Sequence, residues 1–175
     1  MALIIDGKLY RGVIGTAGEI GHTVIVPNGE LCTCGKRGCV MAYASGLALS
    51  RIACQRVRAG EATRLREVCG DSPEYISGEA IAEAARCGDG LALDLIESAG
   101  RYFGMSLAKI IEALNPEVIV IGGGLSRIGP ILLDPCFQAM RENIHPVLIG
   151  VTRIVPAQLG DNAGLIGAAA LVWEN

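Results

Sequence analysis

Charged residues are scarce in this sequence. Only 19% of its 175 residues are Asp, Glu, Lys or Arg, whereas about 25% is usual in soluble domains. So few charges do not cover an ordinary surface, which predicts that another lobe or a second subunit hides part of the exterior. The formal net charge of -3 argues against general binding to the phosphate backbone of nucleic acids.

Other absences narrow the class of protein. We find no signal peptide and no uninterrupted apolar run of membrane-spanning length, so a cytoplasmic location without a membrane is expected. The seven cysteines, an odd number, also fit a reducing cytoplasm better than a disulfide framework. Four of them, Cys54, Cys69, Cys87 and Cys136, are scattered and are interpreted as small buried apolar residues. Residues 1–175 are expected to form one domain with a sizeable core.

Metal-binding residue types cluster within residues 18–41. His22 is followed by Cys32, Cys34 and Cys39 in the pattern C-x-C-G-x-x-G-C. Three thiols and one imidazole complete a tetrahedral zinc shell and leave no position for a catalytic water. Thiolate and imidazole ligands favour zinc over magnesium or calcium. The cluster therefore predicts a structural zinc site, with a C-x-C disulfide or a chance grouping of buried thiols as the alternatives.

The same stretch resembles a known family. The run Glu-x-Gly-His at residues 19–22, followed by the cysteine pattern, is similar to the signature of the ROK family of bacterial sugar kinases and sugar-responsive repressors. Further agreement comes from four segments, so that the resemblance spans nearly the whole chain: 6–12, 42–46, 118–124 and 159–169. In a complete ROK kinase a first half, not represented here, holds one ATP-phosphate loop and the catalytic aspartate.

Strands come first in the expected order of elements, and helices and strands then alternate, which predicts a mixed α/β domain. The resemblance implies the C-terminal lobe of the actin-like ATPase, or ribonuclease-H-like, fold with an inserted zinc knuckle. In that fold a strand in the middle of the sheet precedes the residues that match 2–5. The sequence has Met1 at that point, so we expect the lobe to lack this first strand. An isolated fragment, a misplaced start codon and a real truncation all stay open.

Periodicity and turn signals predict the individual elements. Strands are expected over 3–5, 8–10, 24–26, 118–121 and 151–155, and helices over 42–58, 78–87, 90–114, 130–143 and 162–173. Ser77 and Asp89 are expected to cap the second and third helices. The apolar run 118–121 is typical of a strand covered on both faces. Residues 61–73 are expected to be a surface loop. The small residues of the last helix favour close approach to a sheet, a helix or a ligand.

The resemblance implies a hexose site at Glu19 and His22. A carboxylate accepts hydrogen bonds from two vicinal hydroxyls, and an imidazole that binds zinc through one nitrogen donates from the other. A surface carboxylate for Glu19 and a purely zinc-binding role for His22 are the alternatives. The family usually has a glutamate where this chain has Met41, and losing a charged partner costs about 1.5–3 kcal/mol. The sugar site is therefore expected to be weakened, altered in preference or lost.

A glycine turn, Gly122, Gly123 and Gly124, follows the apolar run 118–121 and precedes a helix. Such a turn lets the backbone approach a nucleotide closely, but any tight strand-to-helix turn uses glycine too. The resemblance implies that this turn lies against the adenosine of ATP, with Mg²⁺ bound in the complete enzyme.

We interpret the chain as the C-terminal lobe of an ATP-dependent hexose kinase of the glucokinase type. It is expected to be inactive alone, because no residue here matches the catalytic aspartate of the family. A homodimer is expected, with no nucleic acid bound through this chain. The alternatives are the sugar-sensing domain of a ROK repressor and a non-catalytic, zinc-stabilised dimerisation module.

Overall fold

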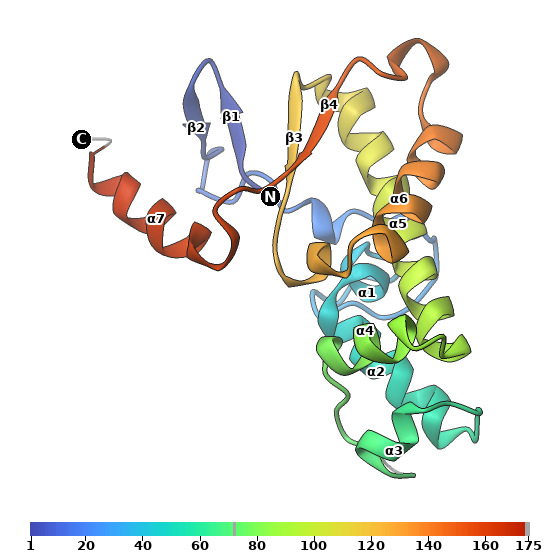
Figure 1. Ribbon diagram of the computed structural model, residues 1–175. Coiled ribbons are helices and arrows are strands. Elements are labelled where there is room, and N and C mark those ends of the chain that lie inside the picture. The colour runs from blue at the N-terminus through green and yellow to red at the C-terminus, as the bar shows by residue number, and fades with distance from the viewer. Residues whose placement is uncertain (72, 174–175) are drawn as a thin grey trace.

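A long helix, α5 (Gly90–Leu114), organises the fold. The structure, a computed structural model, describes residues 1–71 and 73–173. Four other helices pack against α5: α1 (Met41–Ala44), α2 (Gly46–Arg58), α4 (Gly78–Arg86) and α6 (Pro130–Asn143). As predicted, Ser77 caps α4 and Asp89 caps α5, each by accepting a hydrogen bond from a backbone N–H in the first turn. Figure 1 shows these helices gathered on one side of the strands.

Helices α5 and α6 pack very closely against each other. Both Gly100 and Gly104 face α6 so closely that a Cβ on either would clash with a backbone carbonyl, of Leu132 and Cys136 respectively. Cys136 is fully buried in this contact, and burial raises the pKa of its thiol to about 12. The two helices therefore pack backbone to backbone, and the cysteine between them is a small apolar residue, as expected.

The strands form two separate pairs. β1 (Leu3–Ile5) and β2 (Lys8–Tyr10) make the predicted antiparallel hairpin, whereas β3 (Val118–Ile121) and β4 (Arg153–Pro156) pair in parallel. Figure 1 shows β1 and β3 as neighbours, yet no ladder joins them within residues 1–71 and 73–173. This division is consistent with the gap expected in the middle of the sheet.

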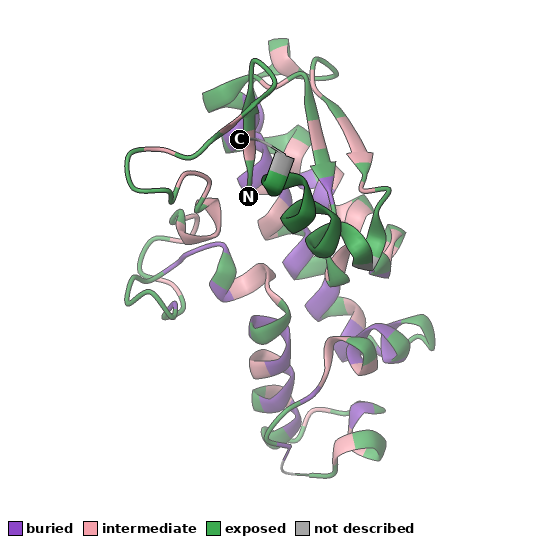
Figure 2. Cartoon of the chain, turned by 90° about the vertical axis from the view of Figure 1, so that its left-hand side faces the viewer, coloured by how far each residue is buried: buried purple, intermediate pink, exposed green. Residues whose placement is uncertain are grey.

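The prediction that β3 is covered on both faces is wrong. Ile119 and Ile121 pack against apolar residues of α5 and α6, but Val118 and Val120 are 40% and 59% exposed. Helices cover only one face of this two-stranded sheet, and the exposed residues of the strands are visible in Figure 2. The apolar run 118–121 predicts burial on both faces of β3, but the described residues cover only one of them.

The last helix also differs from its prediction. α7 (Ala163–Ala170) is shorter than expected and is followed by a 3-10 turn over Leu171–Trp173. Among residues 1–71 and 73–173 the expected close approach is not seen: α7 extends away from the helical half, and its residues are exposed. Leu165, for example, is 75% exposed, and nothing lies within 4 Å of a Cβ built on Gly164 or Gly167.

Four smaller corrections concern local structure. The predicted strand 24–26 has only an isolated bridge from Val24 to Cys39, because Gly38 O takes both the Ile25 and the Val26 N–H. The predicted helix 42–58 is broken at Ser45, whose hydroxyl caps α2. The predicted loop 61–73 contains α3 (Leu65–Cys69), which the buried Leu65 anchors. Cys87, predicted to be buried, is exposed.

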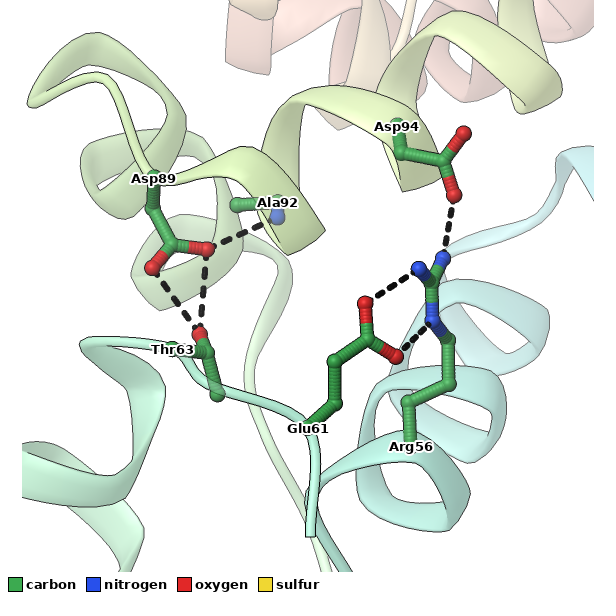
Figure 3. A network of polar contacts seen from close by, with 6 residues as sticks. All are labelled: Arg56, Glu61, Thr63, Asp89, Ala92 and Asp94. Atoms are coloured by element: carbon green, nitrogen blue, oxygen red, sulfur yellow. Dashed lines mark hydrogen bonds and ion pairs between the residues drawn. The ribbon is translucent and has the colours of Figure 1, made fainter. Parts of the chain in front are cut away.

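A polar network ties α2 and the segment before α3 to the start of α5 (Figure 3). The Arg56 guanidinium donates to both Glu61 oxygens and to Asp94, at positions close to the surface. Asp89 is only 6% exposed and accepts from Thr63 Oγ1, from the Arg64 N–H at 2.7 Å and from the Ala92 N–H at 2.9 Å. Burial alone would raise the pKa of Asp89, but these donors outweigh it and hold the pKa below its usual value.

No helix in the described ranges has both the length and the apolar character needed to cross a bilayer.

Candidate metal and sugar site

Two tight turns shape the loop that carries the cysteines. Gly35 and Gly38 have φ values of 86° and 83°, which glycine adopts without strain. A side chain at Gly38 would also clash with the Val26 carbonyl. The Cys32 N–H donates to Lys36 O at 2.8 Å and the Gly35 N–H donates to Cys32 O at 2.9 Å. The loop therefore folds back so that the cysteines on either side of it meet.

The four predicted ligands converge in the structure. The ligand atoms of His22, Cys32, Cys34 and Cys39 all lie within 4.8 Å of one another. The Sγ atoms of Cys34 and Cys39 are 3.7 Å apart, close to the spacing of about 3.8 Å for two thiolates on one tetrahedral zinc with bonds near 2.3 Å. None of the seven cysteines, all in the described ranges, forms a disulfide, so the C-x-C disulfide alternative is not observed. The donor set and its spacing fit zinc.

The thiols of this cluster differ in acidity. The Cys34 N–H, and then the His22 side chain, lower the pKa of Cys32 to about 6 against the opposing effect of burial. Burial, and then the neighbouring Cys34 and Cys32 thiols, raise the pKa of Cys39 to about 11. The opposite pKa shifts of Cys32 and Cys39 mean that these two thiols do not ionise together at neutral pH. A bound Zn²⁺ would supply the charge that stabilises thiolate ligands.

His22 lies between the metal cluster and the predicted sugar residue. Its Nδ1 is 3.4 Å from Cys32 Sγ, and its Nε2 is 3.8 Å from Glu19 Oε2. The Glu19 side chain is 66% exposed and that of His22 is 27% exposed, so solvent reaches both. One ring nitrogen thus faces the thiols while the other lies beside an open carboxylate. The shared role of His22 in binding zinc and sugar stays a prediction.

Two further side chains meet this turn. The Met41 side chain packs directly on Gly21, where a Cβ would lie only 2.6 Å from Met41 Cγ. A thioether therefore borders the Glu19–His22 pair. Sequence reasoning missed Lys36, whose Nζ donates to His22 O at 2.6 Å and ties the tip of the loop to the turn. Its position between the two glycines gave no signal for that contact.

The glycine turn lies at the carboxyl end of β3. Gly123 has a φ of 95°, and Gly122 lies close to Ala157, which follows β4. Of the three glycines only Gly124 lines a cavity of about 640 Å³, and the opposite wall is formed by α4, including Glu79 and Arg86. The sequence predicted the turn but not the contribution of α4, because exposed charges on a short helix carry no periodic signal for a site.

Relatives of this chain are sugar kinases and sugar-responsive regulators. The glucokinase of Streptomyces coelicolor is 41% identical over 98% of this chain and 55% of its own length. The xylose repressor of Bacillus spizizenii is 30% identical over 100% of this chain and 41% of its own length. The chain thus spans about half the length of these relatives.

Solved structures support the same grouping. A ROK family glucokinase from Streptomyces griseus, in complex with glucose and AMPPNP, superposes with a TM-score of 0.79 at 40% identity, over 97% of this chain and 55% of that one. A ROK family transcriptional regulator, a homolog of the E. coli MLC protein, gives 0.78 at 38% identity, over 89% of this chain and 38% of that one. The sequence profile of the ROK family matches residues 1–175. The chain has the α/β fold of the actin-like ATPase superfamily and belongs to the ROK family.

Proposed function

We propose that this chain is the C-terminal, sugar- and metal-binding lobe of an ATP-dependent hexose kinase that acts on glucose or a related hexose. The observation that carries the proposal is the pairing of Glu19 with His22 beside a Cys₃His cluster. Glu19 accepts hydrogen bonds from two sugar hydroxyls, and His22 Nε2 donates a third. The glucokinase relatives support this assignment.

Zinc has a structural role in this proposal. His22, Cys32, Cys34 and Cys39 hold the ion, which fixes the tautomer of His22 so that Nε2 carries the proton. The four protein ligands fill a tetrahedron, so the ion takes no part in phosphoryl transfer.

The nucleotide is proposed to bind beside the glycine turn that follows β3. The cavity of about 640 Å³ next to Gly124 has the size of a small-molecule site. The backbone of Gly122, Gly123 and Gly124 then contacts the adenosine of Mg-ATP, and α4 forms the facing wall. The S. griseus relative was solved with AMPPNP, which supports a nucleotide in this lobe.

A catalytic base is the missing part of the proposed reaction. Transfer of the γ-phosphoryl group needs a carboxylate that takes the proton of the attacking sugar hydroxyl. The family resemblance implies that this carboxylate is an aspartate of the first lobe. We therefore propose that this lobe orients the sugar and ATP but does not turn over alone, and that it requires a partner lobe in the same chain or in trans.

A coupled assay for ADP production tests this function. We expect no hexose-dependent turnover from residues 1–175 alone, and turnover once the first half of the S. coelicolor glucokinase is fused before Met1. In the fusion, Glu19→Gln should lower kcat/KM for glucose by about 10- to 100-fold, because one charged hydrogen-bond acceptor is lost. Glu117→Gln changes an exposed carboxylate that pairs with Arg153 at 3.2 Å, and this matched control should have no effect.

Two results would contradict the proposal. Hexose phosphorylation by residues 1–175 alone would mean that a base lies on this chain. If the fusion binds ATP and the two variants Glu19→Gln and Glu117→Gln have the same kcat/KM for glucose, Glu19 does not bind the sugar.

A second candidate is the sugar-sensing domain of a ROK repressor, which the match to the ROK regulator at 38% identity favours. That role needs the sugar and zinc residues but not ATP, so binding of sugar without any binding of Mg-ATP would support it. The third alternative, a zinc-stabilised dimerisation module, binds neither and is favoured by Met41 in place of a sugar-binding carboxylate.

We also propose that the chain is a single domain that forms a homodimer in the cytoplasm without binding nucleic acid. The exposed apolar faces of β3 and α7 support a covered surface. Light scattering across a concentration series should give twice the mass of the chain, with one cooperative thermal transition. A stable monomer at tens of micromolar would contradict the dimer.

A further inference from the structure

A second cavity lies at the amino-terminal ends of β3 and β4, opposite the glycine turn. Its volume is about 370 Å³, and it is bounded by the end of α5, by α6 and by the segment 144–152 that leads into β4. This segment forms the top of the molecule in Figure 1, above the β3–β4 pair. The cavity is therefore separate from both the cysteine loop and the glycine turn.

The lining is apolar except at its rim. Ile111 and Ile144 belong to a buried cluster, with Met140 and Leu148 packed against it. Ile149, in contrast, lines the cavity and is 51% exposed. Covering such a surface with an apolar group is favourable because it removes apolar area from water. The volume lies at the lower end of the range for small-molecule sites, which suits one phenyl ring or a short alkyl chain.

The charge at this cavity is positive and uncompensated. Arg141 is the charged residue among the described residues that line it, and in the described ranges its guanidinium has no hydrogen bond or ion pair. Two acids close to this segment have other partners: Glu142 pairs with Arg101 at 3.2 Å, and Glu112 pairs with Lys109 at 3.0 Å and accepts from the His145 N–H. An arginine without a partner beside an apolar hollow matches a carboxylate attached to an apolar body.

We propose that this cavity is a binding site for a small monocarboxylate with an apolar body. The carboxylate pairs with the Arg141 guanidinium, and the apolar body covers Ile149 and Leu148. Because such a ligand binds the folded lobe and bridges α6 to the segment before β4, it stabilises the lobe by mass action. The site does not depend on the proposed kinase function.

Titration of ¹⁵N-labelled chain with 4-phenylbutyrate tests the proposal, with neutral 4-phenylbutan-1-ol as the matched probe. We expect amide shifts confined to residues around 140–154, and weaker binding of the alcohol. Arg141→Gln should weaken the acid about 10-fold and change the affinity for the alcohol by less than about twofold, since it removes only the charged partner. Arg101→Gln, the same change at an exposed position on α5, should leave both affinities unchanged.

Three outcomes would overturn the proposal. The first is the absence of shifts at these residues up to millimolar 4-phenylbutyrate. The second is an Arg141→Gln variant, folded by its spectrum, that binds the acid as well as the unaltered chain does. The third is a set of shifts at these residues that follows protein concentration instead of probe concentration, which would assign the cavity to a second copy of the chain.

Discussion

The chain should purify with one Zn²⁺ per molecule, and Cys39→Ser should lower its zinc affinity by more than about 100-fold. Cys39 is fully buried, and its Sγ lies 3.7 Å from that of Cys34. Changes to residues that merely contact a ligand already cost 10- to 100-fold in metal affinity, so loss of a ligand costs more. Competition with a chromophoric chelator measures the affinity, and Co²⁺ substitution reports thiolate ligation through its absorption bands.

The zinc prediction has an internal control and a pH dependence. Cys87→Ser changes an exposed cysteine outside the cluster and should leave zinc binding unaltered. Affinity should fall as the pH falls, because protons compete with Zn²⁺ for the thiolates of Cys32, Cys34 and Cys39 and for His22. Well under one equivalent of zinc in protein never exposed to a chelator would contradict the prediction, as would equal losses from Cys39→Ser and Cys87→Ser.

Asp89→Ala should destabilise the zinc-loaded chain by about 2.5–4 kcal/mol. The estimate combines about 1 kcal/mol for the lost N-cap of α5 with about 1.5–3 kcal/mol for lost hydrogen bonds to a charged group. The substitution also removes the acceptor of the Arg64 N–H and of the Thr63 hydroxyl. Urea unfolding followed by circular dichroism measures the change. The control is Asp94→Ala on the same helix, which removes a surface ion pair worth about 0–1 kcal/mol.

The pH dependence of the Asp89 contribution has a definite sign. Its pKa is lower in the folded chain than in the unfolded one, so its ionised form stabilises the fold. The contribution is complete above the unfolded pKa of about 3.9 and is lost as the pH falls through the folded pKa. The stability difference between Asp89→Ala and the unaltered chain should therefore shrink below about pH 4. A difference that stays constant there, or equal effects of Asp89→Ala and Asp94→Ala, would contradict this account.

Local signals in the sequence were sufficient for the metal cluster and for most helix boundaries. Spacing alone brought His22, Cys32, Cys34 and Cys39 together, because two glycine turns leave the loop few ways to close. Ser77 and Asp89 predicted helix starts because capping depends only on the next three residues. The orientation of His22, with one nitrogen toward the thiols, also followed from the pattern.

The remaining differences depend on contacts made far along the chain or outside it. The sequence around Val118 and Val120 looks like that of a strand buried on both faces. An apolar run does not show which part of the protein covers each face of the strand. The same holds for α7, whose small residues predicted a partner that the described residues do not contain. The break at Ser45 was missed because its hydroxyl offers a cap that competes with a continuous helix. The cavities beside Gly124 and Arg141 are formed by segments distant in sequence, which no periodicity reveals.

The glycine contacts between α5 and α6 have a consequence for the order in which the chain folds. These helices are linked by residues 115–129, which contain β3 and the 3-10 helix Gly124–Ile128, so their docking closes a short loop and costs little chain entropy. The parallel pairing of β3 with β4 closes a longer loop, because α6 and the segment 144–152 lie between the two strands. We therefore expect the α5–α6 pair to form the folding nucleus, with both ends of the chain joining later.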